Sequence, residues 1–257
     1  MTRTLALTRA VPESLARCEL THLARTPIDL ARARAQHTAY EHALAVAGCE
    51  LVRLPELPEF ADSVFVEDCA VVLDELAIAT RPGALSRRGE VESVAAALGA
   101  QREVRSLTGD ATLDGGDVLA LERTLFVGLS RRTNAEGARQ LHALTAPFGY
   151  AIVPLAVESA LHLKTAVTRA GERTLVVNPQ WVETRSFASW ERIEVDAREP
   201  FAANVLRVRD TTICAAAFSR TNDRLRARGI AVNAVDVSEL AKAEAGVTCC
   251  ALIASLG

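Results

Sequence analysis

The size and charge of the chain exclude several classes of protein. Its 257 residues, 49% of them hydrophobic, can bury the core of one domain, so we expect a single domain over residues 1–257. The formal net charge is −3 at pH 7 and the basic residues are scattered along the chain. Such a chain offers no surface to a polyanion, so nucleic acid is not an expected partner.

The N-terminal segment and the cysteines indicate a cytoplasmic protein. Arg9 interrupts the first apolar residues too early for a signal peptide, and no apolar run approaches the length of a membrane span, so we expect no membrane partner. The six cysteines have no C-x-x-C spacing, so we expect free thiols rather than disulfides or a zinc site. Nothing in the sequence requires a metal or another cofactor.

Helical and extended patterns alternate along the chain. Amphipathic periodicity predicts helices over residues 29–47, 88–98, 134–147 and 220–228, with a weaker one over 181–190. A short strand is predicted after each helix, over residues 50–54, 102–107, 150–155, 192–196 and 229–237. The element list therefore indicates five helix-then-strand repeats in an α/β fold.

Each short strand is followed by a loop and then by a longer apolar strand with a polar residue at its entrance. These five residues are Asp68, Asp117, His162, Asn204 and Cys249. Repeats closed around an axis would bring the five loops together at one mouth. We also expect the first strand, Leu5–Arg9, and the last, Thr248–Ser255, to share a sheet and close the ring.

An ordinary layered α/β fold has the same list of elements and is the alternative. The Gly-Gly pair at Gly115 does not support a phosphate loop, because Asp114 and Asp117 flank it and would repel a phosphate.

Cys249 and His162 are candidates for thiol chemistry. A cysteine considered alone is more often a small buried hydrophobe than a nucleophile, and a histidine between leucines is often a core residue. Alternation along the predicted last strand places Cys250 with the core residue Leu252 and leaves Cys249 facing the mouth. The other four histidines fall on or near amphipathic helices, where a surface role is expected.

Acidic residues concentrate in two equivalent loops of the predicted repeat. They are Asp62, Glu67, Asp68, Asp114 and Asp117. Converging carboxylates repel one another unless a cation is bound among them. A cysteine and a histidine beside them make a poor oxygen cage for Mg²⁺ or Ca²⁺, whereas a planar guanidinium matches paired carboxylates. The sequence therefore predicts a site for a small-molecule guanidine.

With these residues in place, nearly the whole chain resembles the dimethylarginine dimethylaminohydrolases. The resemblance lies in Gln36-His-Thr-Ala-Tyr, Asp62-Ser-Val-Phe-Val-Glu-Asp, Thr80-Arg-Pro-Gly-Ala, Ser86-Arg-Arg-Gly-Glu, Leu113-Asp-Gly-Gly-Asp-Val, Gly128-Leu-Ser-Arg-Arg-Thr-Asn, Leu161-His-Leu-Lys and Val247-Thr-Cys-Cys. It implies the five-bladed α/β propeller, or pentein, fold around a central active site. It also implies a single catalytic domain that uses no cofactor.

The resemblance assigns roles to individual residues. Cys249 is the implied nucleophile, His162 the general acid and base, and Asp114 the carboxylate that orients the histidine. The residues implied in substrate binding are Leu20 in a lid segment, Asp62, Glu67 and Asp68 on the cationic groups, Arg87 and Arg132 on the α-carboxylate, and Val247. The family commonly has Asp-Gly shortly before Thr-Cys, where this chain has Glu244-Ala245-Gly246, near the α-amino end of the substrate.

The implied reaction is hydrolysis of Nω,Nω-dimethyl-L-arginine, and of Nω-monomethyl-L-arginine, to citrulline and the amine through a covalent thiouronium on Cys249. The alternatives are a deiminase acting on arginine or agmatine, and a pentein-type ribosome-binding protein without chemistry. The second leaves Cys249 and His162 without a role. The implied assembly is a monomer or a homodimer.

Overall fold

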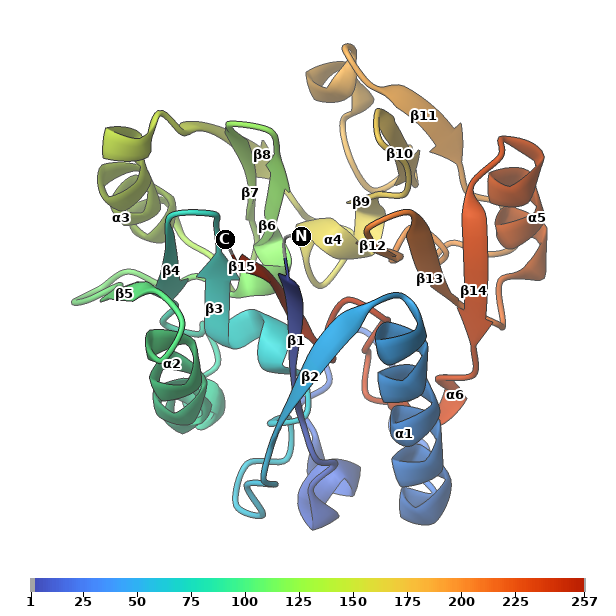
Figure 1. The fold of residues 1–257 in the computed structure, drawn as a ribbon, viewed down its shortest axis with the longest axis horizontal. Helices are drawn as coiled ribbons and strands as arrows, with labels where there is room; N and C mark the ends of the chain where they lie inside the picture. Colours follow the sequence, from blue (N-terminus) through green and yellow to red (C-terminus); the bar gives the residue numbers. More distant parts are fainter. Residues whose placement is uncertain (1–2, 257) are drawn as a thin grey trace.

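Five small sheets surround a common axis in the computed structural model, which describes residues 3–256 (Figure 1). Sheet by sheet, the strands are β15 (Leu252–Leu256), β1 (Arg3–Arg9) and β2 (Cys49–Leu54); β3 (Ala70–Val72), β4 (Leu76–Ala79) and β5 (Glu103–Ser106); β6 (Val118–Leu121), β7 (Thr124–Leu129) and β8 (Ala151–Ala156); β9 (Val167–Arg169), β10 (Thr174–Val177) and β11 (Glu191–Glu194); β12 (Leu206–Val208), β13 (Thr211–Ala215) and β14 (Ala231–Val235). This is the five-bladed α/β propeller, and the prediction of five repeats is confirmed.

Every sheet has the same internal topology. Its middle strand runs antiparallel to the first strand and parallel to the third. A parallel pair needs a crossover connection, and a helix supplies it in four of the five sheets. The helices are α1 (Leu30–Val46), α2 (Val91–Gly99), α3 (Ala135–Thr145), α4 (Leu163–Ala166), α5 (Ser219–Ala227) and α6 (Ser238–Ala241). In Figure 1 the crossover helices α1, α2, α3 and α5 lie at the periphery, while the first strands lie near the centre.

Apolar composition places the strands in order from the axis outward. The middle strand β4 is buried along its whole length, as expected for a segment covered on both faces. In the third strand β5 the two central residues are partly buried and the two end residues are exposed. The first strand β15 pairs antiparallel with β1 (Figure 1). The N- and C-terminal strands therefore share one sheet, as predicted.

Local sequence signals explain where the longer helices begin and end. The Asp29 side chain accepts a hydrogen bond from Arg32 N at 3.0 Å, and Asn134 accepts one from Gly137 N at 2.8 Å. Both are N-caps that pair an otherwise unsatisfied amide. Gly48, with φ of +93°, follows α1 and lets the chain turn into β2.

Three sequence predictions about individual elements need correction. The helix expected over 88–98 begins only at Val91, because residues 85–90 form a 3-10 helix. The weak helix expected over 181–190 is reduced to a 3-10 helix, Thr184–Phe187, in a stretch of Thr, Ser and aromatic residues that propagate an α-helix poorly. The first strands of the sheets are not long, since they span only three to five residues.

The last strand is also shorter than predicted. It begins at Leu252, and Cys249 and Cys250 lie in the preceding turn, where Cys249 N donates to Gly246 O at 3.3 Å. Cys250 is 1% exposed and Cys249 is partly buried. The two thiols thus differ in environment as expected, but because of the turn and not because of strand alternation.

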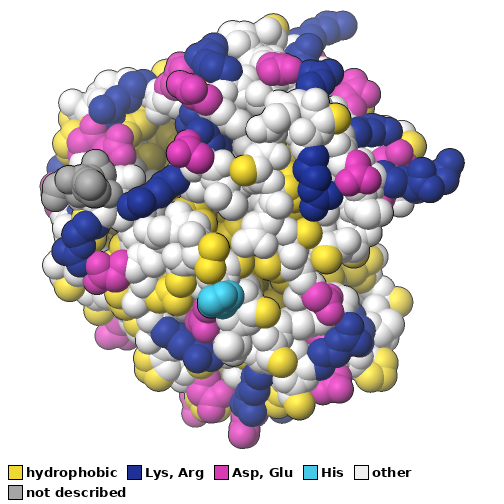
Figure 2. Space-filling view, turned by 45° about the vertical axis from the view of Figure 1, so that its right-hand side comes forward, with side chains coloured by type: hydrophobic (Ala, Val, Ile, Leu, Met, Phe, Trp, Pro, Cys, Tyr) yellow, Lys and Arg dark blue, Asp and Glu magenta, His cyan; other side chains and the backbone are white. Residues whose placement is uncertain are grey.

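Charged side chains of both signs are interspersed around the edge of the face in Figure 2, and hydrophobic ones lie toward its middle. Within residues 3–256, no helix combines the length and the apolar character that a membrane crossing requires.

Asp117 ties the third sheet to the next one. Its fully buried carboxylate accepts hydrogen bonds from Ser130 Oγ at 2.6 Å, Thr133 Oγ1 at 2.7 Å and Leu163 N at 2.9 Å. Ser130 and Thr133 lie in the loop that follows β7, and Leu163 is the first residue of α4. The carboxylate therefore joins two blades through donors that lie away from water.

We expect Asp117→Ala to lower the free energy of unfolding by on the order of 3 kcal/mol, because three buried donors lose their acceptor. Urea unfolding of the reduced protein measures the change. Asp223→Ala is the control, since Asp223 pairs with Arg226 at the surface, and its removal should change the stability by less than about 0.5 kcal/mol. Equal stabilities of the two variants would contradict the structural role of Asp117.

Candidate active site

Loops from several blades converge on one small cavity at the axis. It is lined by Glu19, Asp62, Phe65, Asp68, Arg87, Arg132, Leu161, His162, Ala243, Glu244, Ala245 and Cys249. Asp68, His162 and Cys249 each stand before the first strand of their sheet, so the repeat itself brings them together. The expectation that equivalent loops meet at one mouth is confirmed for these three residues.

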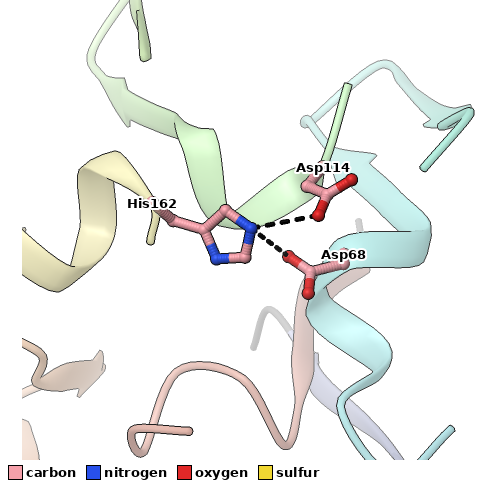
Figure 3. A group of neighbouring side chains, drawn as sticks. All are labelled: Asp68, Asp114 and His162. Carbon is pink, nitrogen blue, oxygen red and sulfur yellow. Dashed lines mark hydrogen bonds and ion pairs between the residues drawn. The ribbon is translucent and has the colours of Figure 1, made fainter. Parts of the chain in front are cut away.

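One ring nitrogen of His162 faces two carboxylates, those of Asp114 and Asp68 (Figure 3). Its Nε2 lies 3.0 Å from Asp114 Oδ2 and 3.8 Å from Asp68 Oδ1. Asp114 is fully buried, and its second oxygen accepts Gly83 N at 2.9 Å. A Cβ on Gly116 would stand 2.7 Å from His162 Nδ1, so only glycine leaves room for the ring in this position. The imidazole is therefore fixed in both place and orientation.

The carboxylates decide the charge of the histidine. Burial opposes a charged imidazole, but Asp68, Asp114 and Asp117 outweigh it and raise the pKa of His162 to about 9. Burial also favours protonation of Asp68, but His162 and Arg87 lower the pKa of Asp68 to about 2. At neutral pH the site thus holds an imidazolium beside an ionised carboxylate.

Cys249 lines the same cavity in a different electrostatic state. Burial and the carboxylates of Glu67 and Asp68 raise the pKa of its thiol to about 12. Gly246 N donates to Cys249 Sγ at 3.3 Å, which favours the thiolate but does not offset the burial. The thiol is therefore protonated at neutral pH, and a cation bound beside Asp68 would lower its pKa.

Arg87 and Arg132 both line the cavity but differ in their contacts. Arg87 is 5% exposed and surrounded by acceptors, with ion pairs to Asp68 at 2.5 Å and to Glu90 at 2.8 Å and main-chain acceptors besides. Arg132 is partly buried, and its Nη2 lies 3.4 Å from Thr21 Oγ1. The Arg132 guanidinium therefore has one long hydrogen bond and can bind a ligand in the cavity, whereas the Arg87 guanidinium is occupied by its ion pairs to Asp68 and Glu90.

Three residues predicted to bind substrate lie outside the cavity lining of the described chain. Glu67 accepts from Lys164 Nζ at 2.8 Å and from Thr248 Oγ1 at 2.6 Å. Leu20 packs against the apolar core. Val247 is 1% exposed, and its carbonyl accepts the Tyr40 hydroxyl at 2.7 Å. Their roles in binding stay predictions, and the contacts seen are structural.

Sequence reasoning missed four lining residues: Glu19, Phe65, Leu161 and Ala243. Glu244 and Ala245, expected near the α-amino end of the substrate, do line the cavity. Adjacency could have indicated Leu161, which precedes His162, and Ala243, which precedes Glu244. Phe65 lies inside the acidic motif that begins at Asp62. No local pattern marks Glu19.

Asp68, Asp114 and His162 also form a possible set of metal ligands, with one ligand atom of each within 4.8 Å of the others. The interactions already present are those of a proton held on Nε2 between two carboxylates. A metal ion would have to displace that proton, so the geometry fits acid–base chemistry directly.

Comparison with known proteins gives consistent matches. The family model described as N,N dimethylarginine dimethylhydrolase, eukaryotic, matches residues 24–253. An N(G),N(G)-dimethylarginine dimethylaminohydrolase of Streptomyces coelicolor is 37% identical over 247 residues, covering 95% of this chain and 94% of that protein. One of Pseudomonas aeruginosa is 36% identical over 228 residues, covering 87% and 89%.

Solved structures agree. A variant of the Pseudomonas aeruginosa enzyme, complexed with citrulline, superposes with a TM-score of 0.94 at 33% identity, covering 98% of this chain and 99% of that one. The N-terminal domain of ArgZ, a cyanobacterial arginine dihydrolase, superposes with a TM-score of 0.89 at 18% identity, covering 99% and 100%. At that identity the second match concerns the fold alone.

The raised pKa of His162 links stability to pH. Because the folded-state pKa of about 9 exceeds the ordinary value of 6.5, the proton stabilises the fold below pH 6.5, and this contribution is lost as pH rises toward 9. We expect the unfolding free energy to fall by on the order of 3 kcal/mol across that window. Urea unfolding at several pH values measures it, and His162→Gln should remove this slope. An unchanged slope in the variant would contradict the assignment.

The state of Cys249 can be titrated directly. With the thiol pKa near 12, the difference in ultraviolet thiolate absorbance between the parent and Cys249→Ser should stay flat through neutral pH and rise only above about pH 10. A difference already present at neutral pH would show a thiolate in the free protein. In that case the burial argument would be wrong.

Proposed function

The chain belongs to the dimethylarginine dimethylaminohydrolase family, and we propose that it hydrolyses Nω,Nω-dimethyl-L-arginine to L-citrulline and dimethylamine. In the same way it would convert Nω-monomethyl-L-arginine to L-citrulline and methylamine. The observation that carries the proposal is the presence of a thiol, a carboxylate-held imidazolium and an ionised Asp68 in one cavity. A guanidinium beside Asp68 would lie next to both reacting groups.

The first step is attack of the Cys249 thiolate on the central guanidinium carbon. The substrate's positive charge, held by Asp68, promotes loss of the thiol proton to solvent, because His162 is already protonated. Nucleophile and electrophile are therefore activated by the same binding event. The carbon becomes tetrahedral, its bond to the methylated nitrogen breaks, and the amine leaves with a proton from His162. A covalent S-alkylthiouronium remains on the cysteine.

The second half of the reaction regenerates the thiol. His162, now neutral, removes a proton from water, and the resulting hydroxide adds to the thiouronium carbon. Collapse of this second tetrahedral intermediate breaks the carbon–sulfur bond, the hydroxyl proton passes to the departing sulfur, and citrulline is released with a neutral ureido group. The proton on His162 is restored, so the cycle consumes one water and uses only protein groups.

Substrate binding is assigned by contact with the cavity. Asp62 and Asp68 would take the cationic groups, and Arg132 the α-carboxylate. Arg87 would act mainly by holding Asp68 ionised, since their ion pair lowers the pKa of the Asp68 carboxyl. Leu20, Glu67 and Val247 would act from outside the lining, Glu67 through the segment that carries Cys249.

We further propose a single catalytic domain over residues 1–257 that works in the cytoplasm as a monomer or a homodimer, with no nucleic acid or membrane partner. All six cysteines are free thiols, which suits a reducing compartment. The interspersed charges in Figure 2 suit a small-molecule enzyme.

The test is product analysis with three substrates in parallel: asymmetric dimethylarginine, arginine and agmatine. We expect citrulline and dimethylamine from the first, with turnover lowered at least about a thousandfold in Cys249→Ser because the nucleophile is lost. Release of ammonia from arginine or agmatine in preference would make the protein a deiminase with the same thiol chemistry. Absence of turnover with every guanidine would favour the non-enzymatic alternative, and co-sedimentation with ribosomes would then test it.

A further inference from the structure

Residues 19–23 border the cavity through Glu19 and are held there by charged side chains that line it. Glu19 N donates to Asp62 Oδ2 at 3.0 Å, and Arg132 Nη2 donates to Thr21 Oγ1 at 3.4 Å. The carboxylate of Glu244 accepts the main-chain amides of three successive residues, Thr21, His22 and Leu23. All three holding side chains line the cavity.

The contact made by Glu244 is the most extensive of the three. Thr21 N lies 3.0 Å from both carboxylate oxygens, and the next two amides point at one of them. Successive main-chain amides that converge on one anion form a strong, charge-assisted site. Glu244 itself has φ of +60°, a backbone conformation that costs a non-glycine residue energy and persists only when surrounding contacts compensate for it.

An apolar contact reinforces the polar one. Leu23 is 39% exposed and forms one wall of a second cavity, of about 240 Å³, whose other walls include Phe201, Phe218 and Val237. Glu244 also lines this second cavity, so it stands between the two cavities. Residues 21–23 are thus held in two ways. Their main-chain amides bind the Glu244 carboxylate, and the Leu23 side chain lies among the apolar residues of the second cavity.

The active-site cavity is too small for the substrate in this state. Its volume is about 30 Å³, which by this measure holds roughly two water molecules and no amino acid. Lining groups, which include Glu19 of this segment and Glu244, must therefore shift before dimethylarginine reaches Cys249. An entering substrate would compete for all three contacts. Its carboxylate can bind Arg132, and its ammonium group can donate to Asp62 or to Glu244 in place of the amides.

We propose that Glu244 is a latch: its carboxylate holds residues 21–23 beside the cavity, and release of these amides lets Glu244 and Glu19 move and admits the substrate to Cys249. Glu244 is a positioning residue, because it acts on the reaction through the segment. The inference rests on the proposed function only for the identity of the substrate. The attachment of residues 21–23 to Glu244 follows from the contacts themselves.

Two variants separate the latch from a simple charge effect. Glu244→Gln keeps the length of the side chain but replaces one acceptor oxygen with a donor that faces the amides. Glu244→Asp keeps the charge near the thiol but withdraws the carboxylate by one methylene. A change in thiol pKa would follow the first variant alone, whereas a loosened latch would follow both.

The measurements are hydrogen exchange of the amides of residues 21–23 and the rate of Cys249 carboxamidomethylation by iodoacetamide, quantified at that residue by mass spectrometry. Loss of a charge-assisted contact should raise both rates by about tenfold or more in both variants. Neither measurement needs turnover, so failure of the proposed function and failure of the latch are distinguishable. For an active enzyme, the variants should also change KM more than kcat.

Glu19→Gln is the matched control, because Glu19 lines the same cavity and its carboxylate accepts from Ser86 Oγ at 2.7 Å, away from the amides of residues 21–23. Exchange at those amides should stay within about twofold of the parent rate in this variant. Parent-like exchange and alkylation in both Glu244 variants would overturn the proposal. Acceleration in Glu244→Gln alone would also overturn it, in favour of a charge effect on the thiol.

Discussion

The proton held on His162 by buried carboxylates is the interaction on which the site depends. Three acids, Asp68, Asp114 and Asp117, are each at most 4% exposed, and each stabilises the imidazolium. Without a cation among them their mutual repulsion would oppose folding. Arg87 balances part of this charge from one side and His162 from the other. Protonated His162, which donates the proton that the leaving amine requires, therefore also neutralises the buried carboxylates of the folded protein.

The repeat explains how residues far apart in sequence form this cluster. Asp68, Asp117, His162, Asn204 and Cys249 occupy equivalent positions before the first strands of the five sheets. Asn204 and Asp117 use that position for structure: the Asn204 side chain bonds to Thr248 N and Oγ1 at 3.0 Å each, beside Cys249, and Asp117 joins two blades. The position before the first strand of a sheet thus supplies the two reacting groups, Cys249 and His162, and also residues that hold neighbouring segments in place.

Much of this could be predicted from the sequence, for reasons that particular residues make clear. The five repeats and the positions of Cys249, His162 and Asp68 follow from helix and strand periodicity, which is local information. The pairing of β15 with β1 also follows, because a chain of open repeats must close.

Other features depend on contacts that local patterns do not contain. Glu67 lies in the acidic motif predicted to bind substrate, yet its carboxylate accepts hydrogen bonds from Lys164 and Thr248 outside the cavity lining. Glu244 differs from the family only by a small change of side chain. Its positive φ and its bonds to residues more than two hundred positions earlier arise only when the ring closes. The turn at Cys249 is another such feature. Strand alternation correctly predicts that Cys250 is the more buried of the two thiols, but the turn before β15 and not a strand produces the difference.

The electrostatics of the site also give the reaction a direction. A thiol with a pKa of about 12 is a weak nucleophile in the free protein, so Cys249 reacts only slowly with adventitious electrophiles and oxidants at neutral pH. A guanidinium held by Asp68 adds the positive charge that the thiolate needs. Citrulline carries a neutral ureido group in the same place and cannot supply that charge. The thiol therefore returns to its protonated state when the product forms, and attack on the product is disfavoured by the same carboxylates that promote attack on the substrate.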